Sequence, residues 1–222
     1  MKILFFLFVF CSVSACEKNT VQTSKIKGMQ QEDLVNMVMK NDITKVKEAL
    51  EKGSNVNTTD QNGRSLLLIA VIRKQKEMVK LLAQYKADVN LQDVQKDSPF
   101  LYAGASGQTE IVKLFLQNGA RFDIFNRYNG TALIPACERG HVETVTVLAD
   151  TEGFPIDHVN RLGWTALMEA VVLGDGSTKY QQIIQILKNA GANIDIPDKD
   201  GVTALQHSKS LGFKEIVKIL ES

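Results

Sequence analysis

The sequence contains few residues that could support catalysis, metal binding or nucleic-acid binding. Its 222 residues include three histidines, His141, His158 and His207, and no two of them have the spacing of metal ligands. No serine or cysteine lies in a sequence context that would expose a nucleophile. Lys and Arg number 26 against 25 Asp and Glu, so there is no basic excess for a nucleic acid. We therefore expect no enzyme activity, cofactor, metal or nucleic-acid partner.

Two short segments carry weak signals of chemistry. Asp157 and His158 are an adjacent acid and base, but neighbours on an extended segment point to opposite faces. The Asp-Lys-Asp-Gly run at 198–201 resembles part of a calcium-binding loop. Ile196 and His207, however, stand where that loop needs its first and last carboxylates. We therefore expect neither catalysis nor calcium binding from these segments.

What the sequence does contain is an internal repeat. A serine or threonine recurs at Ser65, Ser98, Thr131, Thr165 and Thr203, at intervals of 33, 33, 34 and 38 residues. A period of about 33 residues is typical of arrays whose units cannot bury their own apolar faces and are stabilised by stacking on their neighbours. Such an array exposes a long surface, so we expect it to bind another molecule rather than to transform one.

The residues around each repeat resemble those of ankyrin units. Four segments are similar to the Thr-Pro-Leu-His-x-Ala motif that opens the first helix of an ankyrin unit: 97–103, 130–136, 163–170 and 201–207. Three segments resemble the second helix: 77–87, 110–120 and 215–220. The Gly119-Ala120 ending of one of them suits the left-handed residue that closes a helix.

This resemblance implies an all-α fold, an ankyrin-repeat solenoid of about six helix-turn-helix units joined by β-hairpin-like loops. The array spans 29–222, with approximate units at 29–58, 59–91, 92–124, 125–158, 159–196 and 197–222. The first unit is degenerate, as terminal repeats commonly are because one face meets water. Because such end units cap the array, we expect a monomer.

The amino terminus has the pattern of a secretory signal peptide. A charged start, Met1-Lys2, precedes an apolar run at 3–10 that is too short to remain as a membrane-spanning helix. Val13-Ser14-Ala15-Cys16 then resembles the bacterial lipobox, in which the cysteine becomes the diacylated first residue of the mature protein. Residues 1–15 are therefore predicted to be removed. An ordinary signal peptide followed by an incidental cysteine, and an uncleaved anchor, are the alternatives.

The lipobox resemblance implies a lipid anchor on a membrane at Cys16. Glu17 rather than an aspartate follows, which favours a bacterial outer-membrane lipoprotein facing the periplasm; a Gram-positive host would change the location but not the anchor. Residues 16–28 are polar, so we expect a flexible tether, with a short strand or helix packed on the first repeat as the alternative. With Cys11 removed and Cys16 acylated, Cys137 has no partner for an intramolecular disulfide.

The resemblance also assigns a binding face. Ankyrin ligands usually meet the concave side, which is formed by the hairpin tips and the exposed ends of the first helices. The predicted partner-binding residues are Arg64, Arg73, Asp97, Arg127, Tyr128, Glu138, Arg139, Arg161, Leu162, Trp164 and Leu173. Arg, Tyr and Trp, which often dominate interface energies, are concentrated in units four and five. Trp164 either points out to a partner or lies over a neighbouring hairpin and stiffens the stack.

Unit five also breaks the period. About five residues are added between its two helices, within 174–182. Insertions in repeats map to loops, often beside the binding face, so we expect a loop here.

The leading hypothesis is a non-enzymatic, lipid-anchored module that binds an unknown protein partner in the periplasm through its concave face. It could act as an immunity protein that neutralises a toxin, or as an accessory factor for a periplasmic enzyme. The alternative is a binder of a small envelope ligand, a sugar or lipid head group, at Arg127, Tyr128, Arg139 and Trp164.

Overall fold

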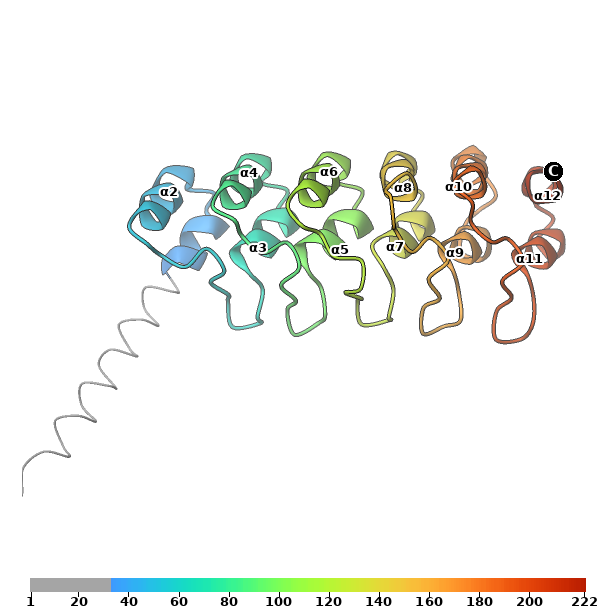
Figure 1. Ribbon diagram of the computed structural model, residues 1–222, viewed down its shortest axis with the longest axis horizontal. Coiled ribbons are helices and arrows are strands. Elements are labelled where there is room, and N and C mark those ends of the chain that lie inside the picture. The colour runs from blue at the N-terminus through green and yellow to red at the C-terminus, as the bar shows by residue number, and fades with distance from the viewer. Residues whose placement is uncertain (1–32) are drawn as a thin grey trace, which may run out of the picture.

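The computed structural model describes residues 33–222, which form an elongated stack of helix pairs (Figure 1). The predicted signal peptide at 1–15, the tether at 16–28 with Cys16, and the start of the first unit lie outside the described residues. Within 33–222 the secondary structure is helical, apart from an isolated bridge between Thr59 and Ser65. The predicted all-α solenoid is confirmed. No helix in this part of the chain is long and apolar enough to cross a membrane.

The first helices of the units form one layer and the second helices form another. The first layer consists of a helix at 33–39, α3 (Leu66–Ile72), α5 (Pro99–Ala105), α7 (Leu133–Glu138), α9 (Ala166–Val172) and α11 (Ala204–Ser210). The second layer consists of α2 (Ile43–Glu51), α4 (Lys76–Gln84), α6 (Thr109–Gln117), α8 (Val142–Ala149), α10 (Thr178–Asn189) and α12 (Lys214–Glu221). From α2 onwards each helix packs on its counterpart in the next unit, and the hairpin loops project from the first layer (Figure 1).

The two layers differ in how much of each helix is buried. The inner helices of the first layer pack on both neighbours and on the second layer, so every residue of α3 from Leu66 to Val71 is buried. A helix of the second layer buries one face only: α6 buries Phe115 and exposes Glu110 and Lys113, which pair at 2.8 Å. A first-layer helix such as α3 is therefore apolar on all sides, and a second-layer helix such as α6 is amphipathic.

The recurring serine or threonine caps the first helix in four units. Each side-chain oxygen accepts a hydrogen bond of 3.1–3.3 Å from the backbone N–H three residues later. Unit four differs: α7 begins after Ala132, and the buried Thr131 Oγ1 has no hydrogen-bond partner in the described structure. The cause is Pro135, which has no N–H to donate to the Thr131 carbonyl, whereas Glu169 makes this bond to Thr165 at 3.0 Å. The repeat was therefore predicted correctly, although the residue in its opening slot does not cap the helix in unit four.

An aspartate or asparagine organises each hairpin tip. Its Oδ1 accepts hydrogen bonds of 2.8–3.1 Å from the backbone N–H groups two and four residues later. The five residues are Asp60, Asp93, Asn126, Asn160 and Asp198. Adjacent tips are also joined directly, because the Arg161 N–H donates to the Tyr128 carbonyl at 2.8 Å. The tips therefore form a fixed row beside the first helices.

The insertion in unit five lengthens a helix as well as a loop. The loop 173–177 has five residues against three at 106–108, and α10 has 12 residues against 9 in α6. The expectation of a loop alone was therefore wrong. In the added turn, Tyr180 is buried and its hydroxyl donates to the Glu138 carbonyl at 2.8 Å, so the extra residues pack on α7.

Replacing the recurring threonine by valine should change stability differently in unit five, where it caps a helix, and in unit four, where it does not. Thr165→Val removes a made hydrogen bond and should lower the free energy of unfolding by about 1 kcal/mol. Thr131→Val removes a buried hydroxyl that has no partner, so stability should be unchanged or higher by up to about 1 kcal/mol. Urea unfolding of both variants measures the difference, and equal losses would contradict the assignment.

Candidate functional site

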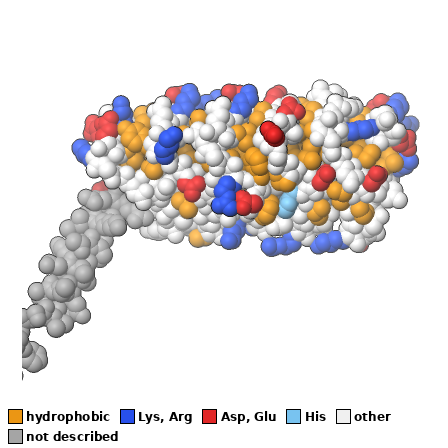
Figure 2. All heavy atoms as spheres, viewed as in Figure 1, with side chains coloured by type: hydrophobic (Ala, Val, Ile, Leu, Met, Phe, Trp, Pro, Cys, Tyr) orange, Lys and Arg blue, Asp and Glu red, His pale blue; other side chains and the backbone are white. Residues whose placement is uncertain are grey.

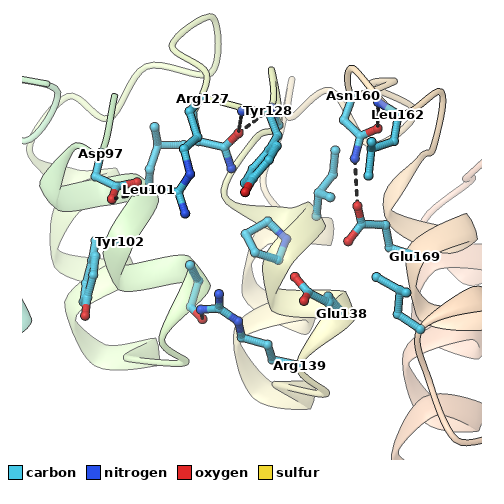
Figure 3. Close-up of a pocket in the computed structure, with 16 residues that line it drawn as sticks. Asp97, Leu101, Tyr102, Arg127, Tyr128, Glu138, Arg139, Asn160, Leu162 and Glu169 are labelled. Carbon is cyan, nitrogen blue, oxygen red and sulfur yellow. Dashed lines mark hydrogen bonds and ion pairs between the residues drawn. The ribbon is translucent and has the colours of Figure 1, made fainter. Parts of the chain in front are cut away.

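One groove lies where the hairpin tips meet the first helices of units three to five. Its volume is about 540 Å³. One face of α5, α7 and α9 forms one side, and the tips that carry Tyr128 and Leu162 form the other (Figure 3). Seven of the predicted partner-binding residues line it: Asp97, Arg127, Tyr128, Glu138, Arg139, Leu162 and Leu173.

The other four predicted residues lie outside this groove. Arg64 is paired with Asp60 of its own hairpin, with Nη2 and Oδ2 2.7 Å apart, and Arg73 is the exposed C-cap of α3. Arg161 lines a shallower depression among the hairpins of units three to five. Trp164 is half-buried and packs against the core. Of the two interpretations of Trp164, its place in the stack fits the one in which it stiffens the array.

The rim of the groove carries exposed apolar side chains. Tyr128, Leu162 and Leu173 are 51%, 49% and 48% exposed, and all three line the groove. The Arg127 guanidinium lies over the Tyr128 ring, 4.9 Å from its centroid. Figure 2 shows orange hydrophobic atoms interspersed with charges of both signs on the viewed face, in keeping with the balanced net charge. A rim of this kind suits the contact between two proteins.

Both arginines of the groove are already engaged. Arg127 Nη1 lies 3.7 Å from Asp97 Oδ2, and Arg139 Nη1 donates to the Ala105 carbonyl at 2.6 Å. The second contact joins unit four to the end of α5 in unit three. Burial, followed by the charge of Asp93, raises the pKa of Asp97. These contacts hold the two arginines against the wall of the groove.

Glu169 is the one buried acid among the groove residues that the sequence analysis missed. It is 5% exposed, and its Oε1 accepts a hydrogen bond of 2.7 Å from the Asn160 amide. Burial and the neighbouring Glu138 raise its pKa to about 7. The sequence did indicate that this position is unusual. Four residues after the recurring serine or threonine, units two to four have Ile69, Tyr102 and Pro135, whereas unit five has a carboxylate.

The last unit makes the same pair with other residues. His207 occupies the slot of Glu169, and its Nε2 lies 2.7 Å from Asp198 Oδ2. That bond is the first cause of the lowered pKa of Asp198. The hairpin residue is Asp198 where its partner is His207, and it is Asn160 where its partner is Glu169. Asp198 therefore has a structural role in its own hairpin.

The remaining weak candidates also have structural partners. Asp157 Oδ1 accepts from the Asn193 N–H at 2.9 Å, whereas His158 stacks on Phe125 with ring centroids 4.3 Å apart. Cys137 is buried, and burial raises the pKa of its thiol. Between residues 33 and 222, no group of three or more His, Cys, Asp or Glu side chains is placed to hold a metal ion.

Comparison with known proteins identifies the repeats. The family model described as ankyrin repeats (3 copies) matches residues 34–126 and 121–198. The chain belongs to the ankyrin-repeat family. These repeats indicate a protein–protein interaction module, in keeping with the exposed rim of the groove.

Bacterial ankyrin-repeat proteins resemble the chain over most of its length. It is 35% identical to the putative ankyrin repeat protein YahD of Escherichia coli strain K12 over 180 residues, which cover 81% of this chain and 89% of that one. A crystal structure of an ankyrin repeat domain from Acinetobacter baumannii AYE has 44% identity and a TM-score of 0.83, covering 85% of this chain and 96% of that one. The ankyrin repeat protein EF0377 has 41% identity, a TM-score of 0.82 and the same coverage.

Glu169→Gln should reduce the pH dependence of stability. Because the pKa of Glu169 is raised to about 7 in the fold from 4.5, the folded ankyrin array holds more protons than the unfolded chain between these values. The free energy of unfolding therefore falls as the pH rises from about 5 to about 8. Glutamine keeps an acceptor for Asn160 but does not ionise, so this fall should be smaller by about 1–3 kcal/mol.

Urea unfolding at both pH values measures this difference. Glu152→Gln, at an exposed position after α8, is the matched control and should leave the fall unchanged. If the fall in Glu169→Gln equals that of the unaltered chain, Glu169 does not carry the raised pKa.

Proposed function

We propose that this protein is a non-enzymatic module that binds a protein partner in the groove of units three to five. The observation that carries the proposal is the apolar rim of Tyr128, Leu162 and Leu173, each about half exposed, around a groove of about 540 Å³. Large exposed side chains beside a hollow are typical of an interaction site. Hairpins that are already fixed favour tight binding, because they lose little conformational freedom when the partner docks.

A small envelope ligand is a weaker match to this geometry. That alternative places a sugar or lipid head group at Arg127, Tyr128, Arg139 and Trp164. Trp164 does not line the groove, and both guanidinium groups already have acceptors. A phosphate or carboxylate would also meet the acids Asp97, Glu138 and Glu169, which line the same groove, whereas a protein surface can cover the rim as it stands.

The anchor belongs to the same proposal. Val13-Ser14-Ala15-Cys16 supports acylation at Cys16, which would hold the array on the periplasmic side of the outer membrane. A toxin-neutralising immunity protein and an accessory factor for a periplasmic enzyme would both use a preformed groove. The identity of the partner separates these two roles.

Loss of the apolar rim should abolish capture of the partner. In a crosslinked pull-down of the full-length protein from its own cells, Tyr128→Ala combined with Leu173→Ala should reduce the recovered partner at least about tenfold, because exposed anchors carry much of an interface's binding energy. Mass spectrometry identifies and quantifies the partner.

The matched control is Met39→Ala combined with Leu211→Ala. These side chains are 40% and 47% exposed but do not line the groove. Recovery should be retained in this control. Equal recovery with the rim variant and the control would reject the groove as the docking surface.

Cys16→Ala should release the protein from the membrane. If Cys16 is acylated, the unaltered mature chain has the mass of the residues from Cys16 onward plus its acyl groups, and it sediments with membranes. The variant should lose both properties. An unchanged mass and an unchanged membrane fraction would exclude the lipid anchor.

A further inference from the structure

Two carboxylates face the groove without forming an ion pair. Glu138 lies at the end of α7 and Glu169 lies on α9, and both point into the space between these helices and the hairpin tips (Figure 3). Among the described residues, Asn160 alone makes a side-chain hydrogen bond to Glu169, and it does so at Oε1. Oε2 faces the groove (Figure 3). None of the ion pairs formed within 33–222 involves either glutamate.

The surrounding charges compensate them only in part. Glu138 acts on Glu169 as a like charge, and Arg139 is the cation that opposes this effect. The Arg139 guanidinium, however, donates to the Ala105 carbonyl, and Arg127 lies next to Asp97 across the groove. A carboxylate that is 95% buried is costly to keep ionised without a paired cation. The groove therefore has room for a cation that would pair with Glu138 and Glu169.

We propose that an arginine side chain of the partner protein binds between Glu138 and Glu169, with its methylene stem against the apolar rim. This inference rests on the proposed protein-binding role of the groove and specifies the chemistry of the partner. A guanidinium has five donors in one plane, enough to bond two carboxylates that come from different helices. Its methylene groups pack on apolar surface while the charged end reaches the acids.

The same geometry makes binding depend on pH. A guanidinium beside Glu169 favours the ionised carboxylate, so binding should strengthen as the pH rises through about 7, the pKa of this group in the free array. The other groups near Glu169 are Glu138 and Arg139, the buried Cys137, and the Asn160 amide. Arginine keeps its charge throughout this range. Affinity should rise up to about tenfold between about pH 6 and about pH 8.

Peptide selection tests the proposal directly. Random twelve-residue peptides displayed on phage are selected against the immobilised full-length protein at about pH 8. The selected peptides should share an arginine next to an apolar residue. Replacing that arginine by citrulline, a neutral isostere, should weaken binding of the best peptide at least about tenfold. Glu138→Gln combined with Glu169→Gln should weaken it by a similar factor and remove the pH dependence.

Two further variants complete the comparison. Glu77→Gln combined with Glu110→Gln alters exposed acids on α4 and α6, and peptide binding should be unchanged. Tyr128→Ala combined with Leu173→Ala should weaken binding whichever residue the peptide uses, because these side chains form the rim.

The outcomes separate this inference from the proposed function. Peptides that need the rim but are insensitive to the Glu138 and Glu169 changes would overturn the arginine site and leave the groove as a docking surface. Peptides insensitive to both sets of changes would overturn both. Selection that yields no shared basic residue, or no binding peptide at all, would overturn the arginine site.

Discussion

The structure depends on the burial of each first helix between its two neighbours. A helix such as α3 is apolar on all sides, so it cannot be stable in one isolated unit and requires the flanking units. Stacking therefore sets both the elongated shape and the position of the hairpins, which must leave the first layer on one side (Figure 1). The hairpin tips are then fixed by their Asp or Asn residues, and the groove is formed by these two constraints together.

The groove lies where the repeat is least regular. Pro135 shortens α7 at its start. At the other end of α7, the hydroxyl of Tyr180 in the extended α10 donates a hydrogen bond to the Glu138 carbonyl. Glu169 replaces an apolar residue in the unit that also carries the insertion. The core of the stack continues through this region, since Val145, Ile183 and Ile184 nearby remain buried. They instead place two acids and an apolar rim in one hollow.

The fold could be predicted from the sequence because stacking of similar units requires a regular sequence period. The site was predicted in part, since seven of the eleven proposed contact residues line one groove. The sequence did not predict which face Trp164 would take, because packing between neighbouring hairpins decides that. The lost cap at Thr131 depends on Pro135 four residues later, and a single slot in the motif does not reveal it. Glu169 was missed because an acid in that slot gains meaning only when Glu138 and Asn160 are known to lie beside it.

Photocrosslinking in living cells tests the central claim, that the groove of units three to five contacts a protein, most directly. A photoreactive phenylalanine analogue would be placed at position 128 or 173 of the full-length chain, and at position 39 or 211 as controls. The account predicts one defined protein adduct from the two groove positions and none from the controls. Adducts from the control positions alone, or none from the groove positions, would contradict it.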